Sequence, residues 1–475
     1  MELPIFHQRR ALLRALGLAS TVGGLTALLG CATPERDPPL TEDLAFTWAL
    51  EAYVYNYPLV YFGRYRALLM LQGDPGKRQK STWGKWMHKT APVTPDVVGA
   101  PQTDTLYSSL WLDVSAEPMV IDIPNIAPRY WSIQFSDLMG TTYGLLNRRN
   151  FGAGGQVLIT GPGWSGTVPP GMKHFPSATT QSFNVLRLYF ADATDQPVAV
   201  ALQQKFQAVP LSLWQQGQRT YAGRDPGAIY RPVPAKDDPL ADFKLIAQML
   251  KENRPSNIPP AERVRFEKLG LMQDGGLEAL PVPVRQAMER AEAQGRQMVT
   301  QASLALPGIR TRNGWVGPKP SIGYYNDGDR MYRASLTLAG TVAVPASENP
   351  YFVMQKEPAS GDFLHGDRRY TLRFEKDMIP QADAFWSLHA YNQSYRVIAN
   401  PINRYSIGDR TQGLQYDPDG SLTLYIQADA PTGAARGNWL PVKKGEVFWL
   451  IVRAYEPRGL IQEMKWDGPV LSRVQ

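Results

Sequence analysis

The sequence predicts a mainly β protein with helical segments, in which two similar β-domains follow one another along the chain. Three observations lead to this prediction. The 475 residues exceed what one hydrophobic core ordinarily serves, so two domains are expected. The 41 Gly, 40 Pro and 11% aromatic residues indicate many turns between short strands, as in sandwiches or barrels. Finally, two segments that lie far apart in the chain share one layout.

The shared layout is a strand with alternating polar residues, followed later by an arginine within an apolar strand. Residues 130–137 read YWSIQFSD and align with residues 385–392, which read FWSLHAYN. Residues 186–189, LRLY, align in the same order with residues 452–455, VRAY. The corresponding pairs are Gln134 and His389, Asp137 and Asn392, and Arg187 and Arg453.

An arginine inside an apolar strand needs a partner or an opening to solvent, because an unpaired buried charge is costly. Arg187 and Arg453 therefore have two interpretations. Each either forms a buried pair with an aspartate that fixes the sheet, or faces a binding site.

The N-terminus has the features of an export signal. Residues 8–14, QRRALLR, form a twin-arginine signature, and a short apolar region follows over residues 15–29. The segment Leu28-Leu29-Gly30-Cys31 has the form of a lipobox, whose cysteine is acylated, for example with palmitate, and becomes the new N-terminus. We therefore expect a signal peptide over residues 1–30, a tether over residues 31–40, and a lipid-anchored protein of the cell envelope. Residue 32 is alanine rather than aspartate, which is typical of sorting to the outer membrane, facing the periplasm.

The first domain is expected over residues 41–214. Thr41 is the expected N-cap of a helix that has Glu42 and Asp43 in its first turn and continues from Leu44 to about Leu69. Pro58 is expected to kink or split this helix. Short alternating or apolar runs then predict strands, and a helix near residues 197–207 closes the domain. The predicted strands are residues 107–114, 119–123, 129–137, 156–160 and 183–190.

A linker and helical segment is expected over residues 215–312, and a second β-domain over residues 313–475. The linker is rich in Gly, Pro and Asp, and three amphipathic stretches after it predict helices. Those helices are residues 241–252, 260–269 and 282–304, and the later strands are residues 369–374, 385–392, 421–427 and 446–455.

Polar, aromatic and charged residues are densest between Ala384 and Tyr425. His389 shares a strand face with Ser387 and Tyr391, which makes it the expected general base; the alternative is a hydrogen-bonded structural histidine. Asp104, Arg404, Tyr405 and Asp409 complete the expected catalytic group, with a role in fixing loops as the alternative. The expected substrate-binding residues are Tyr107, Gln134, Asp137, Arg187, Tyr391, Trp439 and Arg453.

Several kinds of chemistry lack their usual signatures in this sequence. There is no G-x-S-x-G elbow, H-E-x-x-H, C-x-x-C or Walker loop, and the G-x-G-x-x-G match at residues 161–166 is followed by no helix. Only four histidines follow the signal peptide, and they are far apart in sequence. We therefore expect no metal and no nucleotide cofactor. The net charge of +7 is spread along the chain, so nucleic-acid binding is not expected, although anionic substrates or lipid head groups suit it.

Seven motifs in order resemble a tandem bacterial family, "domain of unknown function" 1254 followed by 1214, over residues 42–470. The resemblance implies two tandem jelly-roll-like β-sandwiches with an N-terminal helix and an interdomain helical insert, but no accepted reaction. The family usually has an Asn shortly before the Asp of its first motif, where this chain has Gln102-Thr103-Asp104. The motifs are DTLYS at 104–108, RYWSIQ at 129–134, GPGW at 161–164, FWSL at 385–388, NRYSIGD at 403–409, DGSLTLY at 419–425 and NWLP at 438–441.

From these observations we expect an exported, lipid-anchored hydrolase-type enzyme, which acts on a small polar or anionic substrate in a cleft between the sandwiches. The alternative is a non-catalytic protein that binds saccharide or cell-envelope material, with Trp386, Trp439 and Tyr391 available to stack on sugar rings, or a scaffold. The expected partners are the substrate and, through Cys31, the membrane; the sequence leaves open whether the chain forms a homo-oligomer.

Overall fold

The computed structural model describes residues 40–73, 80–97, 99–228, 234–235, 237–305 and 307–474. The predicted signal peptide, the lipobox with Cys31 and all of the tether except Leu40 lie outside the described residues. From Thr41 onward the chain forms one compact unit. Within the described residues, no helix is both long and apolar enough to cross a membrane.

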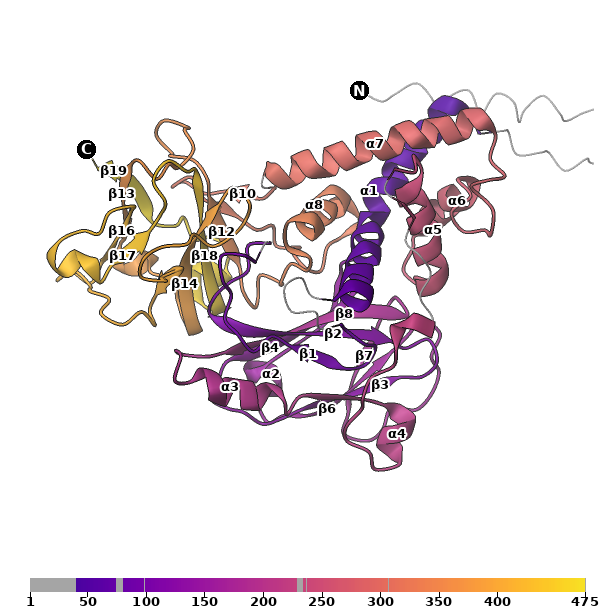
Figure 1. Ribbon diagram of the computed structural model, residues 1–475, viewed down its shortest axis with the longest axis horizontal. Helices are drawn as coiled ribbons and strands as arrows, with labels where there is room; N and C mark the ends of the chain where they lie inside the picture. The colour runs from indigo at the N-terminus through magenta and orange to yellow at the C-terminus, as the bar shows by residue number, and fades with distance from the viewer. Residues whose placement is uncertain are drawn as a thin grey trace, which may run out of the picture. The chain divides into compact units, whose positions relative to one another are not determined.

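The first sandwich packs a five-stranded sheet on a four-stranded sheet (Figure 1). Alternating apolar residues such as Leu110, Ile121 and Trp131 fill the space between the two sheets. The five-stranded sheet has the order β1 (Trp86–His88), β2 (Thr105–Asp113), β8 (Gln181–Tyr189), β4 (Trp131–Asp137), β5 (Thr142–Asn147). The four-stranded sheet has the order β7 (Lys173–Pro176), β6 (Gly155–Thr160), β3 (Met119–Ile123), β9 (Gln207–Pro210).

The second sandwich packs a six-stranded sheet on a four-stranded sheet around a core that includes Trp386, Leu424 and Val452. The six-stranded sheet has the order β10 (Ile309–Arg310), β11 (Val316–Gly317), β12 (Tyr351–Met354), β18 (Phe448–Pro457), β14 (Ala382–Asn392), β15 (Ser406–Gly408). The four-stranded sheet has the order β17 (Trp439–Pro441), β16 (Leu422–Gln427), β13 (Arg369–Phe374), β19 (Val470–Val474). The predicted fold class, mainly β with two jelly-roll-like sandwiches and helical segments, is confirmed.

Helix α1 (Glu42–Ala67) begins where the sequence predicts, because the Thr41 side chain accepts a hydrogen bond from the Leu44 amide. Of the two expected effects of Pro58, a kink or a split, the split does not occur. The helix runs through Pro58 and continues as a short π-helix, Leu68–Gln72. Every residue from Ala52 to Val60 is buried, so packing on all sides holds the helix together where one backbone hydrogen bond is missing.

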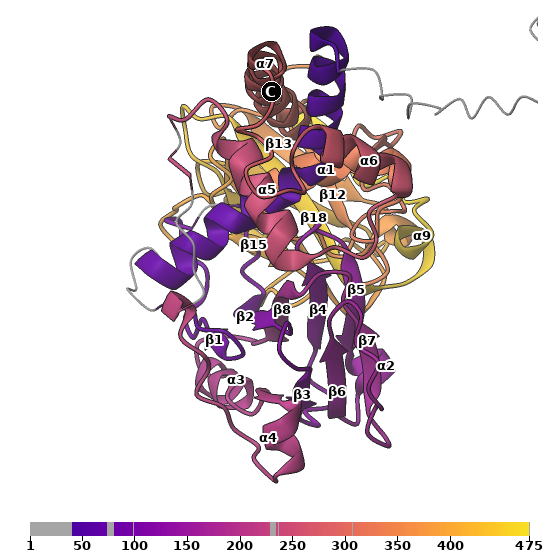
Figure 2. The same ribbon diagram turned by 90° about the vertical axis from the view of Figure 1, so that its right-hand side faces the viewer.

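Four further helices pack against α1 or against one another: α5 (Ala241–Asn253), α6 (Pro260–Lys268), α7 (Val282–Leu304) and α8 (Arg330–Gly340). The C-terminal part of α1 lies over the five-stranded sheet of the first sandwich, where Phe62 contacts Trp111 and Phe183 (Figures 1 and 2). The sequence does not predict α8. The remaining α-helices are short: α2 (Arg148–Phe151), α3 (Gln196–Gln203), α4 (Leu211–Gln215) and α9 (Gly459–Gln462).

The internal repeat is a repeat of strand register as well as of sequence. Strands β2-β8-β4-β5 and β12-β18-β14-β15 have the same order. Arg187 pairs with Ser132 on one side and Tyr107 on the other. Arg453 likewise pairs with Ser387 and with Tyr351. Each sandwich therefore has one sheet with a central arginine flanked by a serine and a tyrosine.

Candidate functional site between the sandwiches

In each sandwich, one strand carries the tyrosine that pairs with the central arginine: Tyr107 in β2 and Tyr351 in β12. The segment before each of these strands packs against the other sandwich. Residues 100–104 precede β2 and contact the second sandwich: the Arg453 guanidinium donates to the Ala100 carbonyl at 2.9 Å, and the Tyr391 hydroxyl donates to the Pro101 carbonyl at 3.0 Å. We call residues 100–104 the first exchanged segment.

Residues 343–348, the second exchanged segment, precede β12 and contact the first sandwich. The Gln134 side-chain amide donates to the Ala343 carbonyl at 2.8 Å, and the Tyr130 hydroxyl donates to Glu348 at 2.7 Å. Glu348 lies three residues before Tyr351, as Asp104 lies three residues before Tyr107. The exchange therefore gives each sandwich a carboxylate that belongs to the other.

Asp104 is held by two hydroxyl groups of the second sandwich. Its Oδ2 accepts hydrogen bonds from Ser387 Oγ at 2.7 Å and from the Tyr455 hydroxyl at 2.8 Å. Burial raises the pKa of Asp104, while these hydrogen bonds and the charge of Arg453 act in the opposite direction. The Asp104 side chain is 11% exposed, so it is largely buried but still accessible to solvent.

His389 is buried next to the Ser387–Asp104 pair. Its Nε2 accepts a hydrogen bond from the Thr103 amide at 3.0 Å, which assigns the ring proton to Nδ1. Nδ1 lies 3.4 Å from Ser387 Oγ, and Nε2 lies 3.8 Å from Asp104 Oδ2. Burial, with a contribution from the charge of Arg453, lowers the pKa of His389 well below its ordinary value. His389 is therefore a neutral donor toward Ser387.

The two central arginines face the same interface but differ in how they are satisfied. Arg453 donates to the Tyr391 hydroxyl at 2.9 Å and to the Ala100 carbonyl. Arg187 makes one longer hydrogen bond, 3.3 Å, to Gln134 Oε1, and its Nη1 is buried with no hydrogen-bond partner among the described residues. Neither arginine forms an ion pair with a carboxylate in the described part of the chain, so the interpretation of Arg187 and Arg453 as buried Arg–Asp pairs does not hold there.

A second polar cluster joins the sandwiches beside this site. Arg148 of the first sandwich donates to Glu456 of the second, with 2.6 Å between Nη2 and Oε2. Arg149 lies 3.5 Å from Glu348, which also accepts from Asn147 at 2.6 Å. Both glutamates are fully buried. Burial raises the pKa of Glu348 to about 7, although its hydrogen bonds and Arg149 oppose the shift.

Two family models match these sandwiches in tandem. The model described as "Protein of unknown function (DUF1254)" matches residues 84–210, and "Protein of unknown function (DUF1214)" matches residues 348–459. The chain belongs to this tandem family. The exchanged segments and strands β2, β4, β8, β14 and β18 of the site lie within or just before the matched residues.

One solved structure shares this fold. A crystal structure of the VPA0106 protein from Vibrio parahaemolyticus superimposes with a TM-score of 0.66 at 22% sequence identity, covering 91% of this chain and 100% of that one. An uncharacterized protein from Burkholderia cenocepacia matches with a TM-score of 0.44 at 13% identity, covering 91% and 94% of the two chains. No curated protein matches this sequence.

The departure from the family's first motif has a local explanation. Gln102 lies close to the position at which the family usually has an asparagine. Its side-chain oxygen accepts hydrogen bonds from the backbone amides of Asp104 and Thr105. An asparagine side chain can cap a turn in the same way. Gln102 therefore fixes the turn that presents Asp104 to the second sandwich.

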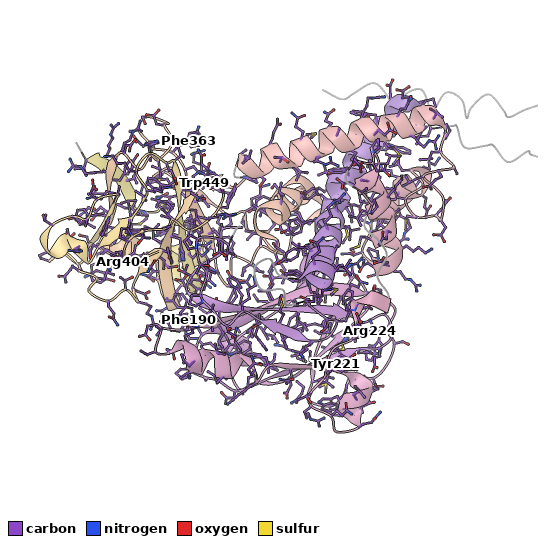
Figure 3. The ribbon with its side chains drawn as sticks, viewed as in Figure 1. Phe190, Tyr221, Arg224, Phe363, Arg404 and Trp449 are labelled. Atoms are coloured by element: carbon purple, nitrogen blue, oxygen red, sulfur yellow. The ribbon has the colours of Figure 1, made fainter. Side chains whose placement is uncertain are left out.

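The structure brings seven predicted residues to this interface: Asp104, Tyr107, Gln134, Arg187, His389, Tyr391 and Arg453. The other predicted residues serve loops and strands. Arg404 donates to backbone carbonyls, including that of Trp439 at 2.9 Å, and Figure 3 shows it within the second sandwich. Tyr405 donates to Asn403, and the Trp439 ring donates to the Gln427 carbonyl.

Two predicted carboxylates also bond to the backbone. Asp137 accepts from the Thr141 amide at 2.9 Å in the turn between β4 and β5. Asp409 accepts from the Trp386 amide at 3.1 Å, beside β15. Burial raises the pKa of each to about 6.

Sequence reasoning missed Ser387, Tyr455, Thr103 and Glu348 as members of the site. Tyr455 could have been predicted from the sequence, because it ends a repeated motif and its equivalent in the first sandwich is Tyr189. Glu348 has the same spacing to Tyr351 that Asp104 has to Tyr107. Within the described residues, no group of three or more His, Cys, Asp or Glu side chains is arranged to hold a metal ion.

Proposed function

We propose that this protein is a hydrolase-type enzyme in which Ser387 is the nucleophile and Asp104 is the general base. The observation that carries the proposal is the 2.7 Å hydrogen bond from Ser387 Oγ to Asp104 Oδ2, made between two sandwiches. A carboxylate whose pKa is raised by burial is a stronger base than one in water, which suits it to accept a proton from a hydroxyl group.

The proposed reaction has two steps. Ser387 Oγ attacks the electrophilic carbon of the substrate, its proton passes to Asp104, and Asp104 then protonates the leaving group as the bond to it breaks. Water next attacks the acyl group on Ser387; Asp104 takes the proton of that water and returns a proton to Ser387 Oγ. His389, whose Nδ1 lies 3.4 Å from Ser387 Oγ, orients the hydroxyl.

His389 is a positioning residue in this proposal rather than the base. In a Ser–His–Asp triad the histidine Nε2 accepts the serine proton. Here the Thr103 amide already donates to Nε2, while the serine hydroxyl points to the carboxylate. The arrangement therefore favours Asp104 as the proton acceptor.

The repeat offers a matched control for the nucleophile. Ser132 is the equivalent of Ser387 in the first sandwich, and both are buried, but its hydroxyl neighbours Tyr130 rather than Asp104. With p-nitrophenyl esters of small neutral and anionic acids as probes, Ser387→Ala and Asp104→Asn should each lower turnover at least about 100-fold. Ser132→Ala should retain most of the activity. Unchanged turnover in both Ser387→Ala and Asp104→Asn would refute the roles of Ser387 as nucleophile and Asp104 as general base.

We further propose that the enzyme is exported by the twin-arginine route and anchored through acylated Cys31 on the periplasmic face of the outer membrane. This part rests on the sequence of residues 8–32. Membrane fractionation with mass spectrometry of the N-terminal peptide tests it. A soluble, unacylated mature protein would refute the anchor, and Cys31→Ala should release the protein from the membrane fraction.

A non-catalytic binding protein is the second candidate. It is favoured by the fact that Asp104 and His389 both already have several hydrogen-bond partners within the protein. Stacking on sugar rings is less suited to this candidate, because Trp386, Trp439 and Tyr391 are all buried. A binding protein would return a bound ester intact, whereas the enzyme would release the acid and the alcohol.

A further inference from the structure

Arg187 has the least satisfied charged group at the interface. Its side chain lies on the central strand β8, and the residue is only 6% exposed. A guanidinium carries five N–H donors, yet Arg187 makes one side-chain hydrogen bond, to Gln134, and its Nη1 has no hydrogen-bond partner in the described part of the chain. Leaving such a donor unpaired in the interior is unfavourable, and more so for a charged group.

The equivalent arginine shows what Arg187 lacks. Arg453 is completed by the first exchanged segment, through the Ala100 carbonyl, and by the Tyr391 hydroxyl. The second exchanged segment does not complete Arg187 in the same way, because its Ala343 carbonyl accepts from Gln134 instead. Gln134 is thereby fixed with its oxygen toward Arg187 and its nitrogen toward Ala343 and Thr142. The asymmetry leaves Nη1 of Arg187 without an acceptor among the residues that the structure describes.

We propose that Arg187 binds a carboxylate group of the substrate. A carboxylate accepts two parallel hydrogen bonds from a guanidinium, which would use Nη1 and add the missing negative charge. The described groups that interact with Arg187 include no carboxylate. They are Gln134, the Tyr107 ring with its centroid 6.0 Å from Arg187 Cζ, the cross-strand Ser132, and the tyrosines Tyr130 and Tyr351. The carboxylate would therefore be the first anionic partner of this arginine.

The position of Arg187 also limits the length of the substrate, provided that the proposed reaction at Asp104 is correct. Arg187 pairs with Tyr107 across β2 and β8, and Asp104 lies three residues before Tyr107. Asp104 lies just before β2, so at about 3.3 Å per extended residue the two positions are at most about 10 Å apart along this segment. This separation suits a short organic acid with an ester or amide bond a few carbon atoms from its carboxylate, such as a monoester of a dicarboxylic acid.

Calorimetric titration of the full-length protein tests the carboxylate site without requiring turnover. The probes are propionate, succinate and glutarate, each paired with its neutral amide. Wild type and Ser387→Ala should bind at least one carboxylate and none of the amides. Arg187→Met and Arg187→Lys should weaken that binding about 10- to 100-fold, in keeping with the loss of a charge-assisted hydrogen bond.

Thermal unfolding of the same variants separates binding from a structural role. Arg187→Met should leave Tm unchanged or higher, because it removes an unpaired buried charge. Arg453→Met should lower Tm, because that arginine has two partners at the interface. A fall in Tm for Arg187→Met as large as that for Arg453→Met would show that Arg187 is structural and would overturn the proposal. So would equal binding of carboxylates and amides, or no binding of any carboxylate.

The two proposals fail in different ways. If Ser387→Ala keeps full turnover while carboxylate binding still depends on Arg187, the nucleophile is wrong and the carboxylate site stands. If Ser387→Ala abolishes turnover but Arg187→Met changes neither carboxylate binding nor the preference for anionic esters, the carboxylate site is wrong and the reaction stands.

Discussion

Glu348 should make the protein less stable as the pH rises from about 4.5 to about 7. This fully buried carboxyl group accepts hydrogen bonds from Tyr130 and Asn147, and its nearest cation, Arg149, is 3.5 Å away. Burial raises its pKa from the ordinary 4.5 to about 7. The native state therefore holds a proton that the unfolded chain releases above about pH 4.5, so folding is favoured most at low pH.

The magnitude follows from the two pKa values. Each pH unit between them is worth about 1.4 kcal/mol, so Glu348 should contribute about 3 kcal/mol of stability below pH 4.5 that is lost by pH 7. The substitution Glu348→Gln retains the shape of the protonated side chain but cannot ionise. The difference in unfolding free energy between wild type and this variant should therefore fall by about 3 kcal/mol across the window and stay level outside it.

Urea unfolding at half-unit pH steps from 4 to 8 measures this difference, and other titrating groups cancel in it. Glu463→Gln is the control, because that side chain is 55% exposed, and its difference from wild type should stay near zero. A Glu348→Gln difference that is flat, or that rises with pH, would refute the reasoning. Such a result would mean that Arg149 keeps Glu348 ionised in the folded protein.

Two further predictions concern packing and charge. Arg148→Ala should destabilise the protein by about 3–5 kcal/mol in urea unfolding, because it leaves the buried Glu456 without its closest cation; a loss below about 1 kcal/mol would contradict this. In α7, Gly295→Ala should cost about 1–3 kcal/mol, because the new Cβ would lie 2.5 Å from Tyr53 Cδ1. At Gly340 a new Cβ would have no described atom within 4 Å apart from its chain neighbours and the backbone of its own helix. Gly340→Ala should therefore be neutral or stabilising by up to about 1 kcal/mol in the same assay, and equal effects of the two would refute the packing argument.

Segments with strong local patterns could be predicted from the sequence almost residue by residue. Strands Met119–Ile123 and Arg369–Phe374 and helix Val282–Leu304 have the predicted bounds. Helix α8 was missed even though its apolar and polar residues follow a clear helical period. Short strands such as β15, with three residues, are too short to show a period of their own and depend on the strand that they pair with.

Site residues could be predicted from the sequence where a polar side chain interrupts an apolar strand. Arg187, Arg453 and His389 stand out as polar groups within apolar strands, and all three face the interface. The dense loop after His389 was misleading, because polar groups such as Arg404 there bond mainly to the backbone of their own sandwich. The partner of Ser387 could not be read at all, since Asp104 lies 283 residues away in the other sandwich.

The exchanged segments also set the order in which this protein can mature. The contacts that complete the site join residues 351 positions apart for Asp104 and Tyr455, and 353 for Ala100 and Arg453. As the chain leaves the ribosome, the first sandwich is synthesised long before β14 and β18 exist. Until β14 and β18 have been synthesised, Asp104 lacks the groups that bury it and should be a solvated carboxylate with an ordinary pKa. The environment that shifts the pKa of Asp104 is therefore complete only after β14 and β18 have been made.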